Sequence, residues 1–355
     1  MLSSIANAKY PDTAPNIPSG NRFLSPGAHS VNGNGMPIPW FFQQESATAF
    51  EKFEMAEDDV VLATVPYGGA TWVHKILINL LHGFDEEGVH KTIPTAAHTT
   101  GQVFVESIPQ HRIVPTNEAE EAQEAGRRDM FGDWVFEMLV SQPNPRLFST
   151  HMYGGMLPAS LLSANGKGKL VVAVRNLKDL LVSTHFFRGE PKDGWLGNEY
   201  GKGSFERFLD PDTANAYGSV FTWVKEMDRI VENLKADERV LVVQYEDLVT
   251  DLPAQIQRVA SFLGQGTLAP ARLDAVVRAS SFLAFGESRN AGMTTERCLT
   301  MILAPKGNVR DWCHHLTEDK WKEFDEVFKS RLANCPLAEK LLDYQRWDMG
   351  TDAKE

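Results

Sequence analysis

The sequence predicts an α/β fold in a single domain, with a central parallel β-sheet flanked by helices. Three observations predict this fold class. Short runs of β-branched and aliphatic residues recur along the chain, each run is followed by a turn, and the turns lead into apolar residues spaced three or four apart. Buried strands that alternate with helices form parallel sheets covered on both faces. The chain of 355 residues, 43% of them hydrophobic, can bury such a core without disulfide bonds.

Each predicted element follows from its own residues. The first strand is expected at 60–65, where apolar and β-branched residues follow one another, and a helix is expected at 72–82, where apolar residues have helical spacing. The other predicted elements are a short strand at 146–150, a strand at 169–174 with a helix at 177–187, and a strand at 240–245 with helices that reach residue 263.

The α/β pattern is confined to residues 57–335. Residues 1–56 are predicted to be an extended arm, because the first 40 or so are rich in Pro, Gly, Asn and Ser and lack hydrophobic periodicity. Residues 336–355 are predicted to be a C-terminal tail. Two stretches, 85–142 and 189–203, interrupt the strand–helix pattern and are predicted to be insertions that form a lid and a substrate gate.

Charge and cysteine content exclude several classes of protein. A formal net charge of -12 argues against a general affinity for nucleic acid or anionic membrane, since both need a basic surface. Three cysteines are too few for a disulfide framework, which indicates a reducing compartment and a core-filling role for them. The first residues lack the basic and apolar segments of a signal peptide, so a cytoplasmic protein is expected. No sequence feature requires a metal ion.

The turn after the first strand is a candidate anion site. Pro66, Gly68 and Gly69 lead into a helix that begins near Thr71, so backbone N–H groups and the positive end of a helix dipole meet at one point. Glycines at a strand–helix junction also serve a purely structural need, so this turn alone does not establish a function. It is not a Walker A motif, because no Gly-Lys-Ser/Thr follows.

Four segments occur along the chain in a particular order. They are residues 64–72 (TVPYGGATW), 149–151 (STH) with the Leu-Pro pair at 157–158, 174–183 (VRNLKDLLVS), and the Lys-Gly pair at 306–307 with the Asp-Trp pair at 311–312. Together they resemble the cytosolic sulfotransferase family, which transfers a sulfuryl group from 3′-phosphoadenosine 5′-phosphosulfate (PAPS) to a hydroxyl or an amine and releases 3′-phosphoadenosine 5′-phosphate (PAP). The resemblance covers about residues 57–335 and implies the P-loop-like fold of that family.

The resemblance also implies roles for individual residues. His151 would be the general base for in-line transfer, since an imidazole with a pKa near the operating pH is suited to accept the acceptor's proton. Tyr67 would donate a hydrogen bond where the family usually has a lysine. The implied donor-binding residues are Gly68, Gly69, Ala70, Thr71 and Trp72 at the 5′-phosphosulfate, Arg175, Ser183, Lys306 and Gly307 at the 3′-phosphate, and Trp72, Tyr245, Ser280 and Phe282 around the adenine.

The acceptor and the assembly are less specified. A small-molecule acceptor is expected, and the aromatic candidates to line an apolar acceptor pocket, each equally compatible with the core, are Phe84, Tyr153, Phe186 and Phe187. The family's dimerisation motif would fall at 313–322, where Thr317 fits but three other positions do not. A monomer or a different dimer is therefore expected.

The chain departs from the family's pattern at three cationic positions. Tyr67, Ser149 and Pro305 stand where two lysines and an arginine are usual. Because a charged donor at a transferring anion stabilises the transition state, turnover is expected to suffer more than nucleotide binding. The sequence therefore predicts a PAPS-dependent sulfotransferase, with a catalytically impaired sulfonucleotide-binding pseudoenzyme as the alternative. A kinase or NTPase is disfavoured, because the Gly-Lys-Ser/Thr motif and a strand-end Asp for magnesium are missing.

Overall fold

The computed structural model describes residues 30–31, 37–38, 42, 44–91, 104–106, 135–187, 204–209, 217–281 and 309–342. Its central sheet has four strands: β3 (Val60–Thr64), β4 (Leu147–Thr150), β5 (Lys169–Val174) and β6 (Val240–Gln244). They pair in the order β4-β3-β5-β6, and every pairing is parallel. The predicted α/β fold class is confirmed. A separate antiparallel pair joins β1 (Ser30–Val31) and β2 (Pro37–Ile38).

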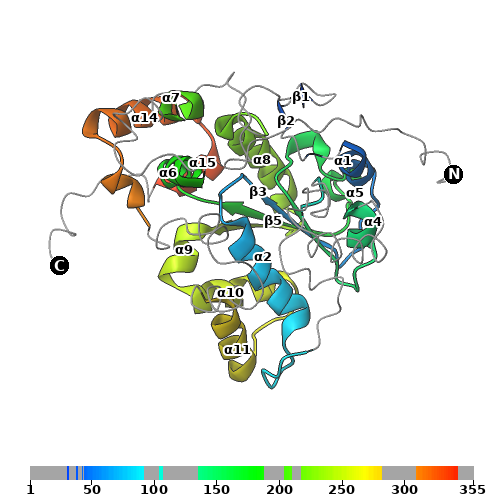
Figure 1. Cartoon of the computed structure of the whole chain (residues 1–355). Coiled ribbons are helices and arrows are strands. Elements are labelled where there is room, and N and C mark those ends of the chain that lie inside the picture. The colour runs from blue at the N-terminus through cyan, green and yellow to red at the C-terminus, as the bar shows by residue number, and fades with distance from the viewer. Residues whose placement is uncertain are drawn as a thin grey trace, which may run out of the picture.

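Helices cover both faces of the sheet (Figure 1). The elements on one face are α2 (Ala70–Ile78), the π-helix η1 (Asn79–Gly83), α9 (Tyr245–Thr250), α10 (Leu252–Phe262) and α11 (Pro270–Ser280). Those on the other face are α1 (Gln44–Glu51), α4 (Val135–Val140), η3 (Gly154–Met156), α5 (Ala159–Leu162), α6 (Leu177–Phe187), α7 (Ser204–Leu209), α8 (Val220–Lys235), η5 (Asp311–His314), α14 (Glu318–Arg331) and α15 (Pro336–Leu342).

The sheet divides the hydrophobic core into two clusters. Val60 and Leu62 of β3 belong to the cluster under α2, and Val61 and Ala63 belong to the cluster under α8. This alternation follows from the two-residue period of a strand. The strands are buried on both faces, which explains why the sequence shows them as continuous apolar runs rather than as alternating patterns.

Helices α1 and α15 correct the predicted boundaries of the arm and the tail. Phe50 of α1 and Leu341 of α15 are buried in the core, and the Leu337 N–H donates to Asp228 of α8 at 2.7 Å. The predicted arm (1–56) and tail (336–355) therefore extend too far into the folded part. Helices of eight and seven residues with only three buried residues each give a weak periodic signal, which explains the error.

Parallel strands end at one edge of the sheet, so the residues that come after them meet there. At this edge the chain continues from β3 into the turn at 65–69, from β4 into His151, from β5 into Arg175 and from β6 into Tyr245. The predicted insertions at 85–142 and 189–203 lie largely outside the described residues. Within the described part, Cys335 is buried, Cys313 is half-buried, and both are free thiols. No helix there is long and apolar enough to cross a bilayer.

Candidate functional site

The turn between β3 and α2 has a backbone that its glycines make possible. Gly69 has a φ of 95°, and a Cβ at this position would lie 2.7 Å from the Tyr245 ring. A Cβ on Gly68 would lie 2.8 Å from Oγ1 of Thr64, so neither position accepts a larger residue without movement. Gly69 also precedes α2 as its N-cap, and no side chain caps the helix. The backbone N–H groups of the first turn, those of Ala70 and the exposed Thr71, can therefore bind an anion at the N-terminus of α2.

Arg175 lies on the β5 side of this turn. The residue is 6% exposed, its Cζ lies 4.4 Å from the centre of the Tyr245 ring, and Nη1 donates to the carbonyl of Tyr67 at 3.4 Å. Its buried Nε has no hydrogen-bond partner. An unpaired buried guanidinium N–H is costly, and an anionic oxygen would satisfy it.

Trp72, Tyr245 and Ser280 come together beside Arg175. The rings of Trp72 and Tyr245 meet edge to face at 5.3 Å, and the indole N–H of Trp72 donates to the Ser280 carbonyl at 2.7 Å. The Ser280 hydroxyl accepts from the Asn79 amide at 3.0 Å. Ser280 is fully buried and therefore joins the end of α11 to α2, while the two aromatic rings form the wall on this side.

The predicted 3′-phosphate residues are only partly described. Ser183 lies buried on α6, the helix that begins just after Arg175. Lys306, Gly307 and Phe282 lie outside the described residues. The described chain resumes at residue 309, and Asp179 of α6 accepts the N–H groups of Arg310 and Trp312 at 2.9 Å each. The first turn of α6 therefore holds the segment that comes after the Lys-Gly pair.

His151 lies on the β4 side of the turn. Its Nδ1 is 2.7 Å from the carbonyl oxygen of Thr64. A carbonyl only accepts hydrogen bonds, so Nδ1 carries the ring proton and Nε2 presents a lone pair. Burial lowers the pKa of His151 from 6.5 to about 4, although the Thr64 contact opposes this effect. The imidazole is therefore neutral near pH 7 and suited to accept a proton at Nε2.

Aromatic rings fix the orientation of His151. Phe104 stacks on the imidazole with ring centres 4.1 Å apart, and Tyr217 packs edge-on at 5.3 Å. Glu106, two residues after Phe104, is fully buried and accepts the His151 backbone N–H at 2.8 Å. Sequence reasoning misses Phe104, Glu106 and Tyr217. The apolar triplet at 103–105 inside a predicted insertion is a strand-like signal, and Phe104 indeed forms a parallel bridge with Ser149 of β4.

Ser149 stands where the family usually has a lysine, and it contacts another uncharged side chain. The Ser149 hydroxyl lies 2.9 Å from Nδ1 of His74 on α2. Burial, and to a lesser extent Lys75, lowers the pKa of His74 to about 4. His74 is therefore uncharged near pH 7 and does not replace the missing ammonium. Tyr67 has a φ of 67° and packs half-buried against the core under α8.

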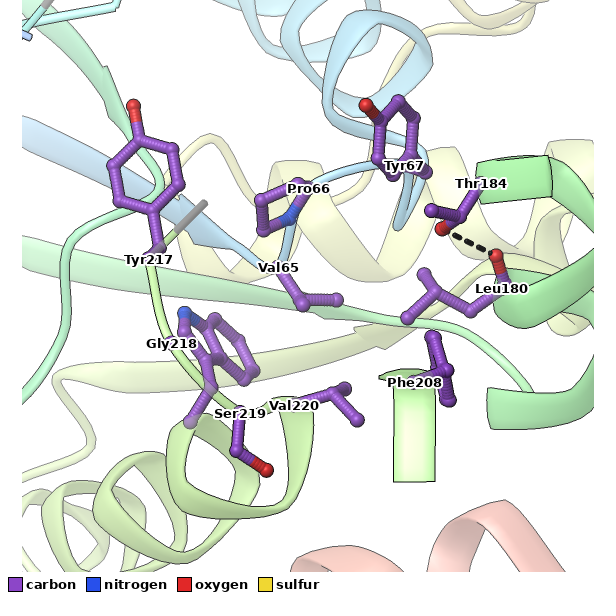
Figure 2. Close-up of a pocket in the computed structure, with 11 residues that line it drawn as sticks. Val65, Pro66, Tyr67, Leu180, Thr184, Phe208, Tyr217, Gly218, Ser219 and Val220 are labelled. Carbon is purple, nitrogen blue, oxygen red and sulfur yellow. Dashed lines mark hydrogen bonds between the residues drawn. The ribbon is translucent and has the colours of Figure 1, made fainter. Parts of the chain in front are cut away.

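A small apolar cavity of about 50 Å³ lies beside the turn. Figure 2 shows the segment Val65 to Tyr67 between Tyr217 on one side and Leu180 and Thr184 of α6 on the other. The hydroxyl of Thr184 donates to the Leu180 carbonyl at 2.8 Å, so it is satisfied within its own helix. The remaining lining residues are Pro66, Phe208, Gly218, Ser219, Val220 and Trp223. Tyr217 thus lines the cavity and also packs against His151.

The predicted lining residues are not those of this cavity. Phe84 belongs to the core on the opposite face of the sheet and packs against His90. Tyr153 packs against the core under α8, and the side chains of Phe186 and Phe187 lie outside the described part. A sequence signal for the correct wall exists: a Tyr-Gly-Ser triplet at 217–219 precedes the strongly periodic α8, whose N-cap is the serine.

Comparison with known proteins gives one consistent result. A family model described as sulfotransferase domain matches residues 57–336. The chain is 26% identical over 311 residues to the 3-beta-hydroxysteroid sulfotransferase of Cavia porcellus, covering 86% of this chain and 94% of that protein. It is 28% identical over 313 residues to sulfotransferase 6B1 of Mus musculus, covering 86% of this chain and 87% of that protein.

Solved structures are similar in fold. The mouse sulfotransferase SULT7A1 complexed with PAP has a TM-score of 0.61 at 23% identity, covering 88% of this chain and 96% of that one. Retinol dehydratase in complex with androsterone and inactive cofactor PAP has a TM-score of 0.59 at 17% identity, covering 86% and 89%. Among the residues described, no group of three His, Cys, Asp or Glu side chains is arranged to hold a metal ion.

Proposed function

This chain belongs to the sulfotransferase family, and we propose that it transfers the sulfuryl group of PAPS to a hydroxyl or an amine of a small molecule, with His151 as general base. One observation carries the proposal. The glycine turn after β3 lies between a buried arginine that has an unpaired N–H and a buried histidine that is neutral and presents Nε2.

The residues around the turn suit the donor. The uncapped first turn of α2 and the glycine backbone fit the 5′-phosphosulfate. Arg175 fits the 3′-phosphate, because a phosphate oxygen would satisfy its unpaired Nε. Trp72 and Tyr245 fit the adenine as an aromatic wall. Relatives of similar fold were solved with PAP, which supports the same donor here.

The proposed chemistry assigns one step to His151. PAPS supplies an electrophilic sulfuryl group and its 5′-phosphate as leaving group. His151 accepts the acceptor's proton at Nε2 while the acceptor oxygen or nitrogen bonds to sulfur in line and the bond from sulfur to the 5′-phosphate oxygen breaks. The Thr64 carbonyl holds Nδ1–H and stabilises the imidazolium that forms. The cavity shared by Tyr67 and Tyr217 would receive an apolar part of the acceptor.

A second candidate function is a pseudoenzyme that binds the sulfonucleotide without transferring sulfate. The observation that favours it is the neutral set of side chains at the lost cationic positions, with Tyr67 in the turn and Ser149 in contact with the uncharged His74. Transfer develops charge at these positions, whereas binding of the 3′-phosphate relies on Arg175.

Calorimetric titration with PAP, beside adenosine 5′-phosphate and ATP, tests the donor site. PAP is expected to bind at least about 100-fold more tightly than adenosine 5′-phosphate, and Arg175→Met is expected to remove most of this difference, because truncating one side of a buried charge pair costs about 2–5 kcal/mol. The matched control is Arg146→Met, which removes a half-buried, ion-paired arginine at the far edge of the sheet. Equal affinity for the two nucleotides would disprove the proposed donor.

Turnover then separates the enzyme from the pseudoenzyme. With PAPS and a panel of phenols, alcohols and amines, His151→Gln is expected to lose about 10²–10⁴-fold in rate while it still binds PAP. Tyr67→Lys restores the family's lysine without new backbone strain, because the native tyrosine already has a positive φ. If the wild type has no turnover and Tyr67→Lys gains it, the protein is a pseudoenzyme. Turnover by the wild type would rule out the pseudoenzyme.

A further inference from the structure

Two buried glutamates flank the glycine turn at the C-terminal edge of the sheet. Glu106 and Glu246 are each 0% exposed. Oε1 of Glu106 accepts the backbone N–H of His151, just after β4, at 2.8 Å. Oε1 of Glu246 accepts the backbone N–H of Asn176, just after β5, also at 2.8 Å. Strands β4 and β5 are the two neighbours of β3, so the glutamates act on opposite sides of the turn.

Each glutamate comes with an aromatic ring that packs on the functional side chain of its own side. Phe104, two residues before Glu106, stacks on the imidazole of His151 at 4.1 Å. Tyr245, the residue before Glu246, lies under the guanidinium of Arg175 at 4.4 Å. The segment 104–106 therefore contacts both the backbone and the side chain of His151. The pair Tyr245 and Glu246 contacts the Arg175 side chain and the backbone that follows it.

The Glu106 carboxylate uses both oxygens. Oε2 accepts from the hydroxyl of Thr150 at 2.9 Å, and that hydroxyl in turn accepts the N–H of Met152 at 3.0 Å. The backbone on both sides of His151 is thereby fixed. The N–H of Val105 donates to the Ser149 carbonyl at 2.9 Å and ties the segment to β4.

The Glu246 carboxylate uses one oxygen. The N–H that it accepts belongs to the peptide unit that joins Arg175 to Asn176, so it fixes the direction in which the chain leaves Arg175. The side chain of Asn176 then caps α6 by accepting the N–H groups of Lys178 and Asp179 at 2.9 and 3.1 Å. Oε2 of Glu246 is buried without a hydrogen-bond partner.

Burying a carboxylate is unfavourable, and burial raises the pKa of both groups. A neutral acceptor would satisfy one backbone N–H at lower cost. The two-oxygen arrangement at Glu106 and the matching aromatic rings point to a positioning role.

We infer that Glu106 and Glu246 are positioning residues that act independently, Glu106 on the base His151 and Glu246 on the nucleotide-binding Arg175. This inference rests on the proposed function. It predicts that a change at Glu106 alters His151 and leaves Arg175 unchanged, and that a change at Glu246 does the reverse.

Two measurements that need no acceptor test it. The ¹⁵N spectrum of the histidine side chains reports whether the proton of His151 resides on Nδ1, with the signal assigned by its loss in His151→Gln. Calorimetric titration measures the affinity for PAP, which reports on the position of Arg175. Each variant is judged on both, so the unaffected side serves as its folding control.

Glu106→Gln keeps one acceptor oxygen and replaces the other with an amide nitrogen, which only donates, so the variant cannot accept from both donors. We expect the single Nδ1–H tautomer of His151 to be lost and PAP affinity to stay within about threefold. Glu246→Met removes the acceptor for Asn176 and is expected to weaken PAP binding by about 10-fold or more, the effect of one buried N–H left unpaired, with the His151 spectrum unchanged. Glu246→Gln keeps the one oxygen in use and is expected to retain PAP affinity within about threefold.

Several outcomes would overturn the inference. An unchanged His151 tautomer in Glu106→Gln rules out its positioning role, and unchanged PAP affinity in Glu246→Met rules out the other. Loss of both properties in either variant rules out independence. If wild-type protein does not prefer PAP to adenosine 5′-phosphate, the proposed function fails together with the Glu246 half, while the His151 spectrum still decides the Glu106 half.

Discussion

Protonation of His151 is expected to destabilise the folded protein in mild acid. The residue is 9% exposed, and burial lowers its pKa from 6.5 to about 4. The unfolded chain therefore binds more protons between pH 4 and pH 6.5, so this contribution to stability is present above pH 6.5 and is lost as the pH falls towards 4. At about 1.4 kcal/mol per pKa unit, the loss totals about 3 kcal/mol, of which about 2 kcal/mol falls between pH 7 and pH 5.

Urea unfolding of wild type and His151→Gln at the two pH values measures this difference. Glutamine does not titrate, and its amide can donate to the Thr64 carbonyl as Nδ1 does. The free energy of unfolding of wild type is expected to fall by about 2 kcal/mol more than that of the variant between pH 7 and pH 5. His74, whose pKa is also about 4, is present in both proteins and cancels. Equal losses would refute the conclusion that His151 is buried in its neutral form.

The same contacts give three further predictions. His151 stays neutral down to about pH 4, so kcat/KM of an active protein should not fall between pH 8 and pH 6. With a histidine base of ordinary pKa, kcat/KM would fall about fourfold over the same range, and a pH–rate profile distinguishes the two cases. Gly69→Ala places a Cβ against Tyr245 at a φ of 95°, so urea unfolding should show a loss of about 2 kcal/mol and calorimetry a weaker affinity for PAP. Asp59→Asn weakens the partly buried pair with Arg146 (2.6 and 2.8 Å) at the opposite edge of the sheet, so it should cost about 2 kcal/mol of stability and leave PAP affinity unchanged. A changed affinity would contradict the separation of the two edges.

The sheet is predictable from the sequence because each strand is buried on both faces. A continuous apolar run such as 170–174 favours a buried strand, and β5 covers this run together with Lys169 before it. The errors lie at the ends of elements. The sequence pattern places Tyr245 at the end of a strand because aromatic residues favour strands, yet it begins α9, where its ring packs against Trp72 and Arg175. That role depends on contacts with distant residues.

Phe84 shows a different limit. The sequence offers it only as an aromatic candidate for an acceptor pocket, and the structure has a π-helix, η1, between α2 and Phe84. A π-helical turn contains one more residue than expected and rotates the chain beyond it, so helical spacing in α2 says little about the direction of Phe84. Glu106 escapes prediction for a related reason. Its contact with His151 spans 45 residues of sequence, and no local pattern encodes it.

The order of the strands would allow the proposed nucleotide binding and the proposed transfer to be lost separately. The turn after β3 has β4 on one side and β5 on the other, so His151 and Arg175 approach it from opposite directions and contact different carbonyls, those of Thr64 and Tyr67. The lost cationic position that the structure describes on a strand, Ser149, lies on the β4 side, where charge would develop during transfer. Arg175 on the β5 side remains. On the proposed function, substitution on the β4 side is therefore expected to weaken transfer without removing the contact of Arg175 with the nucleotide.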